Sequence, residues 1–235
     1  VNRLYEAGVS KGVIYPMNRD GSYGPGSAWN GLISVTVNPS GSMETEWADN
    51  LEYRDRLTRP QFSATINAYD YPAAFGTCIG EECLSPGIYV MGRRPLRFGL
   101  CYRTGIGNAI SSDIGYKIHF IYGAYAEPSE TAYETYSEEL NPLTHNWTIH
   151  SKPLRVSGLK PISHLVVDSR SLSEAKLASL SELIYGTDET DPVFPMPDNL
   201  VHLHGYLYEA LFTRDGEAIL TRDDQEIIAR VMIEE

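Results

Sequence analysis

Hydrophobic and polar residues alternate with a period of two over several short runs of the chain, which is typical of β-strands with one buried face. Two such runs, within residues 96–125, flank a stretch rich in Gly, Asn and Ser and predict a β-hairpin whose tip is Gly105-Ile106-Gly107. The second run predicts a half-buried strand with Lys117 and His119 on its polar side. Its apolar side carries Tyr116, Ile118, Phe120 and Tyr122.

The same alternation predicts four further strands, at residues 32–37, 62–70, 144–150 and 162–168. In the first of them Ile33, Val35 and Val37 are expected to point inward. A short strand is predicted at residues 13–15. Residues 200–212 and 218–235 give two more candidate elements, which would form a strand pair around Asp215-Gly216.

One helix is predicted over residues 171–185. Ser171 and Glu174 have the spacing of a capping box, and Gly186 stands where a helix-terminating glycine belongs. The apolar stripe of the helix consists of Leu177, Leu180, Leu183 and Ile184. We expect this stripe to cover one face of the sheet.

Three segments show no regular pattern. Residues 1–12 are expected to form an N-terminal arm, and residues 71–87 a loop rich in Pro, Gly and Cys. Residues 42–60 form a long, densely charged connection with isolated apolar side chains, for which we expect an assembly role. With 235 residues the chain is predicted to be one mainly β domain, in which residues 200–235 form a C-terminal extension.

Charge and composition limit the function. The formal net charge of −12 argues against a nucleic-acid-binding protein, which needs a basic patch to neutralise phosphates. No apolar run approaches the roughly 18 residues of a membrane span, and residues 1–12 do not resemble a signal peptide. We therefore expect a location in the cytoplasm or in an assembled particle.

Motifs for catalysis or for cofactor binding are not visible. Gly105-Ile106-Gly107 lacks the third glycine and the helix of a dinucleotide site, and no serine has a nucleophile-elbow context. His202 and His204 alternate along a predicted strand, where a solvated face is favoured over a metal site. For the three cysteines, at positions 78, 83 and 101, reduced thiols are favoured over a Cys78–Cys83 bridge. We expect no enzyme activity, no metal and no cofactor.

The polar sides of the predicted strands are unusual, because they carry small uncharged residues where solvent faces commonly carry Lys and Glu. If these strands share one sheet, the residues form a continuous polar surface suited to a wet channel. They are Ser34, Thr36, Ser63, Thr65, Asn67, Thr144, Asn146 and Thr148.

Several phrases of the sequence occur in a distinctive order: YGPGSAWNGL, ETEWADNLEY, SATINAYDYPAAFGTC, FGLCYRTGIGN, GYKIHFIYGAYAEPSETAY, LIYGTD and PMPD. Together they resemble the major tail protein, or tail tube protein, of long-tailed (siphovirus-type) bacteriophages. The resemblance covers residues 8–198. It implies a β-sandwich or partial barrel with one flanking helix, in which six copies close into a ring and the rings stack into a hollow tube for the genome.

The resemblance also implies partners and contact segments. Tape measure, terminator and distal tail proteins are the expected partners, viral DNA passes through without specific binding, and the protein resides in the tail of the virion after assembly in the bacterial cytoplasm. The arm at residues 1–12 and the loop at residues 42–60 are the candidates for contacts between subunits or rings. In that loop the expected contact residues are Glu44, Glu46, Trp47, Asp49, Leu51, Tyr53 and Leu57.

Two other function classes compete with the tube subunit. Sixteen tyrosines would suit a β-rich virion decoration or carbohydrate-binding module, although they are spread over the predicted strands and do not gather at one loop tip. An enzyme, such as a hydrolase, would need a nucleophile or a general base that no motif supplies.

Overall fold

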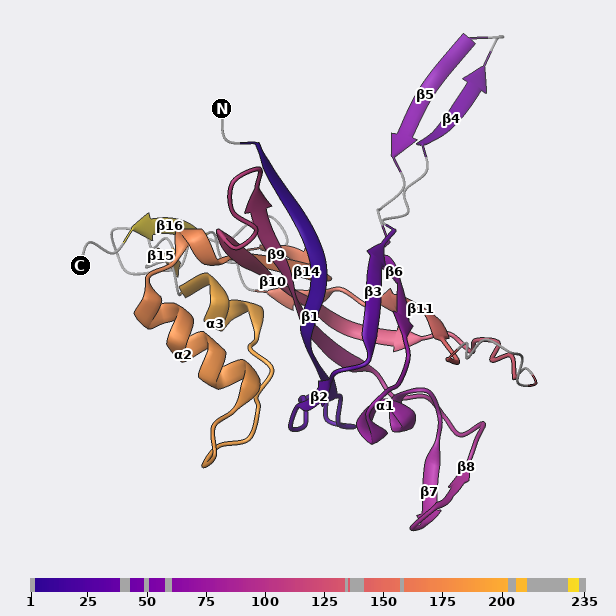
Figure 1. Cartoon of the computed structure of the whole chain (residues 1–235). Helices are drawn as coiled ribbons and strands as arrows, with labels where there is room; N and C mark the ends of the chain where they lie inside the picture. Colours follow the sequence, from indigo (N-terminus) through magenta and orange to yellow (C-terminus); the bar gives the residue numbers. More distant parts are fainter. Residues whose placement is uncertain are drawn as a thin grey trace.

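The computed structural model describes residues 3–38, 43–48, 51–57, 61–133, 135, 142–156, 159–202, 206–210 and 228–232. Its centre is one antiparallel sheet with the strand order β2-β1-β9-β10-β11-β6-β3, and β14 pairs with β10 (Figure 1). The strands are β1 (Leu4–Pro16), β2 (Ser27–Trp29), β3 (Leu32–Val37), β6 (Ser63–Ala68), β9 (Phe98–Asn108), β10 (Gly115–Ala126), β11 (His145–Ser151) and β14 (His164–Asp168). The predicted mainly β fold with a flanking helix is confirmed.

The sheet curls around a first core. Alternate side chains of β6 and β11, including Ile66 and Ile149, are fully buried in this core, and α1 (Ala73–Cys78) adds Phe75. Strand β3 lies beside β1 at the Leu32 end. Leu32 is so close to Gly12 that a Cβ atom at position 12 would be 2.4 Å from Leu32 Cδ1. The curvature gives the sheet an enclosed inner side and an outer side, as in a partial barrel.

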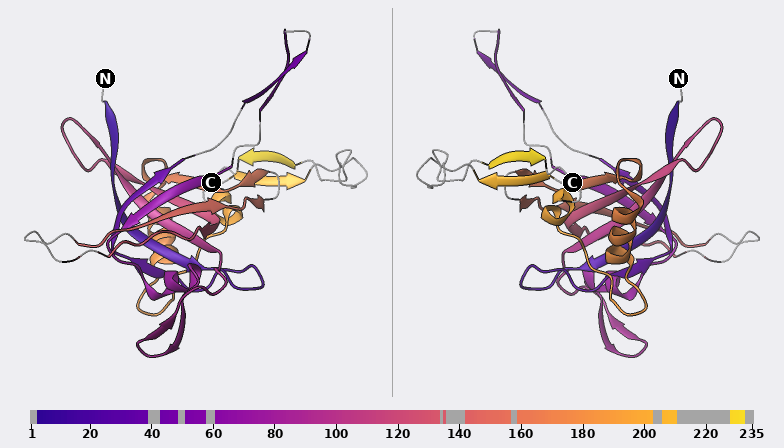
Figure 2. Two further views of the ribbon diagram at one scale, coloured as in Figure 1. Left: turned by 90° about the vertical axis from the view of Figure 1, so that its right-hand side faces the viewer. Right: turned by 90° about the vertical axis from the view of Figure 1, so that its left-hand side faces the viewer.

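A second core lies on the outer side of β1, β9 and β10, where α2 (Glu174–Tyr185) and α3 (Pro197–His202) cover the sheet (Figure 2). The ring of Phe194 is its centre, with ring centroids 4.6 Å from Tyr23 and 4.7 Å from Tyr15. The Tyr15 hydroxyl donates a hydrogen bond of 2.5 Å to the carbonyl of Ile184 near the end of α2. This layer fixes the helix on the sheet.

The predicted helix is confirmed, but its start differs from the prediction. Ser171 lies in a 3₁₀ turn, η1 (Ser169–Ser171), and Ser173 is the N-cap without a side-chain cap hydrogen bond. Gly186 ends the helix with φ of 72°, as expected. Of the predicted stripe, Leu180 and Ile184 are buried, whereas Leu183 is 37% exposed.

Strand β10 is not half-buried as predicted, because both of its faces are covered. Ile118, Phe120 and Tyr122 pack in the second core, while Ile121 packs in the first. His119 is buried on the same side as Ile121. A strand at the centre of the sheet with cores on both sides shows apolar residues at consecutive positions, which hides the alternation.

The predicted hairpin tip at residues 105–107 is wrong. These glycines lie within β9 and pair with β1, where Gly105 faces Ala7 and Gly107 faces Tyr5. The turn follows Asn108, whose side-chain oxygen accepts hydrogen bonds of 2.8 Å from the backbone N–H groups of Ile110 and Ser111. The side chain of Asn108 therefore replaces the glycine turn that the sequence suggested.

The predicted arm at residues 1–12 is corrected as well, since residues 4–12 belong to β1 and pair with β9. The register shifts twice, between Ala7 and Ser10 and between Ser10 and Val13. Gly8 and Lys11 lie near these shifts with φ of 75° and 50°. Two bulges in one strand break the period of two, which explains why the alternation was not visible.

Four two-stranded hairpins complete the described fold (Figure 2). They are β4 (Met43–Ala48) with β5 (Leu51–Leu57), β7 (Glu82–Ser85) with β8 (Ile88–Val90), β12 (Leu154–Val156) with β13 (Leu159–Ile162), and β15 (Tyr206–Ala210) with β16 (Ile228–Met232). The predictions of loops at residues 42–60 and 71–87 are therefore wrong, because both contain paired strands and the second contains α1. A strand pair near the C-terminus is confirmed, while its predicted turn at Asp215-Gly216 lies outside the described residues.

Candidate functional site

The outer face of β3, β6 and β11 forms a continuous polar surface, which we call the polar face. Cross-strand pairing aligns Ser34, Asn67 and Asn146 in one row. Thr36, Thr65 and Thr148 form the next row. Since directly paired residues of antiparallel strands point to the same side, these six side chains share one face. The structure thus brings together six of the eight residues that the sequence singled out.

The other two predicted residues lie at the ends of the polar face. Ser63 faces His150 in a third row. Thr144 precedes β11, which begins at His145, and is exposed. It therefore lies beyond the paired part of the strand.

Hydrogen bonds across the strands hold the polar face together. Asn67 Nδ2 donates to Ser34 Oγ at 2.9 Å, and Asn38 Nδ2 donates to Thr65 Oγ1 at 3.5 Å. Ser63 Oγ donates to the Asn38 carbonyl at 2.5 Å. These bonds order Ser34, Ser63, Thr65 and Asn67 and occupy part of their hydrogen-bonding capacity.

No residue of β3, β6 or β11 belongs to the second core, so the described helices do not cover the polar face. Below this face, the alternate residues Ala64, Ile66, Trp147 and Ile149 are buried in the first core.

The predicted inward orientation of one β3 residue is wrong. Ile33 is 41% exposed because a bulge between Leu32 and Ser34 shifts the register, so it does not point inward with Val35.

Ionisable side chains at the edge of the polar face have partners. His150 Nε2 lies 2.9 Å from Glu127 Oε1, and the His150 ring lies 5.5 Å from Tyr125. The guanidinium of Arg97 lies over the same Tyr125 ring, 5.0 Å from its centroid, and Arg97 Nη1 donates a hydrogen bond of 2.9 Å to the Gly123 carbonyl. The rows of Ser, Thr and Asn themselves contain no Lys, Arg, Asp or Glu.

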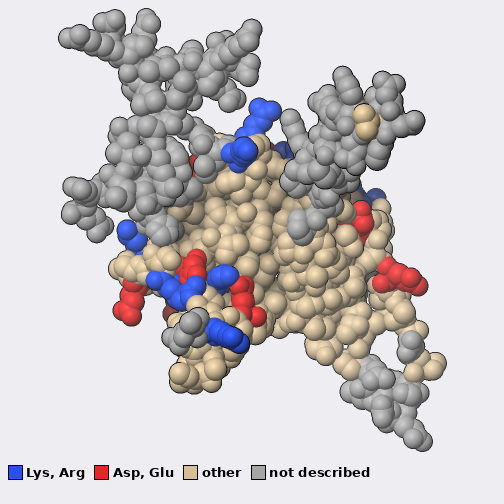
Figure 3. All heavy atoms as spheres, turned by 90° about the horizontal axis from the view of Figure 1, so that it is seen from above, with Lys and Arg blue, Asp and Glu red and all other residues tan. Residues whose placement is uncertain are grey.

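Figure 3 shows the end of the molecule at which β1 begins. Lys and Arg side chains alternate with Asp and Glu at one side of this end, and the described residues in the middle of the view carry no charge. Opposite charges that lie side by side give little net potential.

The predicted assembly segment is the β4–β5 hairpin, which stands away from the sheet beyond β3 and β6 (Figure 1). Glu44, Glu46 and Trp47 lie on β4, whereas Leu51, Tyr53 and Leu57 lie on β5. Trp47 pairs with Glu52 across the hairpin. Asp49 lies outside the described residues.

A second projecting hairpin, β7–β8, was missed in the sequence. Its strands are exposed on both sides, and Leu84, Ile88, Tyr89 and the adjoining Met91 are exposed large apolar residues. Arg93 Nε pairs with Glu82 Oε2 at 2.7 Å beside it. The short spacing of residues 82–90 around Pro86-Gly87 is the signal that could have predicted it.

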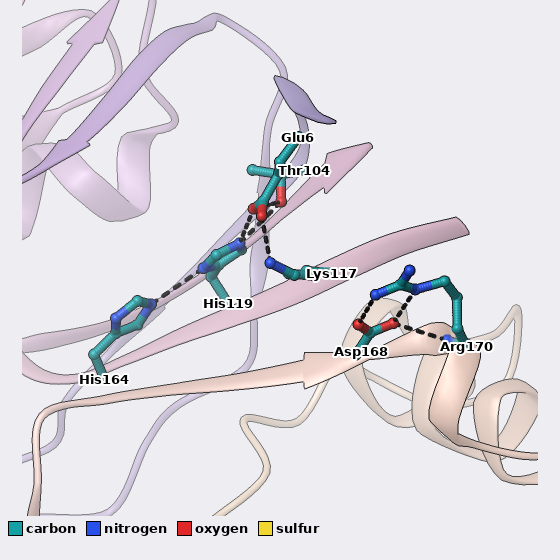
Figure 4. A network of polar contacts seen from close by, with 7 residues as sticks. All are labelled: Glu6, Thr104, Lys117, His119, His164, Asp168 and Arg170. Carbon is teal, nitrogen blue, oxygen red and sulfur yellow. Dashed lines mark hydrogen bonds and ion pairs between the residues drawn. The ribbon is translucent and has the colours of Figure 1, made fainter. Parts of the chain in front are cut away.

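A polar network between β1, β9, β10 and β14 was also missed (Figure 4). Glu6 is its hub: Lys117 and Thr104 both donate to its carboxylate, and His119 Nε2 lies 3.3 Å from Glu6 Oε1. His119 Nδ1 lies 3.2 Å from His164 Nε2. At the other end of β14, Asp168 Oδ2 accepts a hydrogen bond of 2.6 Å from Arg170.

The environment of this network shifts its pKa values. Burial would raise the pKa of Glu6, but the hydrogen bonds from Lys117 and Thr104 outweigh it and the pKa is lowered. Burial lowers the pKa of His119, although the Glu6 carboxylate opposes this shift. Burial and the neighbouring His119 lower the pKa of His164 to about 4. Both imidazoles are therefore neutral, and Glu6 is ionised, near pH 7.

The three cysteines are free thiols. Cys78 and Cys101 are buried, and burial raises the pKa of Cys78 to about 12, so both lack the thiolate character that reactivity requires. Cys83 is exposed on β7. Among the described residues, no group of three or more His, Cys, Asp or Glu side chains could hold a metal ion.

Comparison with models of known protein families gives no match, and comparison with curated proteins gives no significant relative. Within the described part of the chain, no helix has the length and apolar character needed to cross a membrane.

Proposed function

We propose that the chain is a structural subunit of the tail tube of a long-tailed bacteriophage. In this proposal six copies close into a ring, and the rings stack into a hollow conduit for delivery of the genome into the host. The supporting observation is the polar face: an uncovered, in-register surface of small uncharged residues on three adjacent strands. We place this face on the lumen of the tube.

The chemistry of the polar face suits a conduit for DNA. A single Lys or Arg in each subunit, repeated around every ring, would make many phosphate contacts that act together, and such contacts dominate affinity for DNA. Small uncharged Ser, Thr and Asn side chains offer few strong contacts to phosphates. The net charge of −12 gives about −72 for six copies, which opposes adsorption of DNA.

Assembly would rely on the projecting elements. The β4–β5 and β7–β8 hairpins extend away from the sheet, and exposed apolar residues on β7–β8 need a partner surface. A single two-stranded hairpin is only marginally stable in water. We assign both hairpins to contacts between copies of the chain. The other tail proteins, namely the tape measure, terminator and distal tail proteins, would meet the tube at its ends or in its lumen, in a virion assembled in the bacterial cytoplasm.

This function requires no catalysis and no cofactor. The experiment that tests it is native mass spectrometry of the purified full chain, combined with electron microscopy of the same sample. The proposal expects a six-fold assembly unit and stacked rings. A stable monomer at every concentration, with no rings or tubes, would contradict it.

A virion decoration or carbohydrate-binding module is the second candidate, and one observation favours it. Tyr69, which directly follows β6, is 55% exposed, and Tyr125, which pairs with His150 of β11, is 38% exposed. Exposed tyrosines beside Asn and Thr side chains could stack on sugar rings. A glycan array separates the candidates: glycan binding by a monomer supports the module, whereas its absence in a protein that forms rings supports the tube.

A further inference from the structure

His119 and His164 form a close pair at the junction of β10 and β14 (Figure 4). Their facing nitrogens are 3.2 Å apart, and their rings stack at 5.4 Å with an angle of 15° between the planes. Tyr102 of β9 stacks on His119 at 4.7 Å, and the Phe62 ring lies 5.3 Å from His164. Aromatic side chains thus flank the pair and limit its contact with water.

The neighbours of the pair determine which nitrogen donates. Two acceptors face His119 Nε2: Thr104 Oγ1, whose own proton is donated to Glu6, lies 2.9 Å away, and Glu6 Oε1 lies 3.3 Å away, so Nε2 carries the proton. His119 Nδ1 must then accept the hydrogen bond from His164 Nε2. This arrangement satisfies both facing nitrogens when the two rings are neutral.

The pair can hold one additional proton within the fold, but not two. A proton on His119 is stabilised by the Glu6 carboxylate, and the resulting imidazolium can donate through Nδ1 to a His164 ring that has changed tautomer. A second proton, on His164, would place two N–H groups against each other at 3.2 Å. The Lys117 ammonium on β10 adds to the repulsion, and from β14 only the more distant Asp168 carboxylate opposes it.

We propose that the His119–His164 pair is an acid-operated joint that releases the His164 end of β14 from β10. At the other end of β14, Asp168 pairs with Lys117 of β10, and three hydrogen bonds from Arg170 order the Asp168 side chain within its own segment. Ser169 Oγ also accepts a hydrogen bond of 2.9 Å from the Tyr116 backbone N–H. Opening therefore starts at His164 and pivots near Asp168.

The release uncovers a strand edge. Residues 117–121 of β10 pair with residues 164–168 of β14 along this edge. An unpaired edge of five residues at the centre of the sheet is a template for another strand. We therefore expect acid to expose the backbone N–H and C=O groups of residues 117–121 along this edge, whatever the protein's role in a larger particle.

Hydrogen–deuterium exchange of the full chain, compared at about pH 7.5 and about pH 5 after correction for intrinsic rates, tests the joint. The segment 163–168 should lose protection by about tenfold or more at the lower pH, whereas the β1–β9 pairing keeps its protection. His164→Gln keeps a neutral donor toward His119 and should abolish the loss. The matched control, His150→Gln, removes a histidine of the outer face and should behave as the wild type.

Equal protection of segment 163–168 at both pH values, or the same loss in His164→Gln, would overturn the proposal. If His164→Gln does not fold, NMR titration of the wild-type imidazoles decides. The joint requires two separated steps, with the second proton entering below about pH 5. Two imidazoles that titrate together near the ordinary pKa of about 6.5 would contradict it.

Discussion

Substitution of Phe194 by Ala tests the layer that fixes the helices on the sheet. Phe194 belongs to the segment between α2 and α3, and its ring is surrounded by Tyr15, Tyr23 and Tyr122 with centroid distances of 4.6 to 5.0 Å. The ring also lies over Gly99, where a Cβ atom would be 2.5 Å from Phe194 Cε1. Gly99 has no side chain with which to fill the space that the ring would leave.

The magnitude follows from burial. Phe194 is buried, and a side chain of about 150 Å² or more at about 25 cal/mol per Å² contributes about 4 kcal/mol. Measured Phe→Ala substitutions in cores cost about 3–5 kcal/mol because a cavity remains. For a chain of this size, each 1 kcal/mol lowers Tm by about 2–4 °C, so we expect a decrease of about 6–20 °C.

Urea unfolding followed by circular dichroism measures the change in the free energy of unfolding. The matched control is Val193→Ala, an exposed neighbour in the same segment, for which we expect less than about 0.5 kcal/mol. A loss below about 1 kcal/mol for Phe194→Ala would refute the packing described for the second core.

Three further predictions concern the polar face, the histidine pair and the β4–β5 hairpin. The double variant Thr65→Lys, Asn67→Lys should fold but should slow the passage of DNA through assembled tubes, and added salt should relieve the effect, whereas Thr65→Glu with Asn67→Glu should not slow DNA. An ejection assay at two salt concentrations measures this, and unchanged kinetics in the Lys variant would refute the electrostatic argument. The folded state holds the pKa of His164 at about 4, below the unfolded value of about 6.5, so the free energy of unfolding should be constant above about pH 6.5 and fall by about 1–2 kcal/mol by pH 5. Denaturant unfolding measures this change, and a free energy of unfolding that does not depend on pH would contradict it. Replacement of residues 43–57 by a short Gly/Ser linker should leave circular dichroism and Tm nearly unchanged but abolish tubes in electron microscopy, and normal tubes in this variant would remove the hairpin from assembly.

The alternation of hydrophobic and polar residues predicted those strands that have one buried face and one polar face. Strands β3, β6 and β11 each have one face in the first core and one polar face, so the alternation of their residues was visible in the sequence. The helix was recognised because its apolar stripe and Gly186 are local features. Of strand β1 only residues 13–15 were predicted, because two bulges disturb the period of the preceding residues. Strand β10 was misjudged because cores cover both of its sides.

The polar face shows what a sequence can and cannot give. Its residues were identified by their type and spacing, but their placement in rows depends on the order β11-β6-β3, which joins strands that are distant in the chain. The Glu6–His119–His164 network depends on side-chain contacts between β1 and β10, whose residues Glu6 and His119 are more than 100 positions apart in the chain. The spacing of residues along the chain does not reveal contacts between distant strands, so Glu6 and His164 could not be distinguished from ordinary polar residues.

Cryo-electron microscopy of the assembled protein tests the central claim most directly, because it shows both the symmetry and the orientation of each subunit. The account predicts six-fold rings stacked into a tube, with Thr36, Thr65 and Thr148 facing the lumen. A tube in which these side chains face outward would contradict the placement of the polar face. A particle without rings would contradict the proposed function itself.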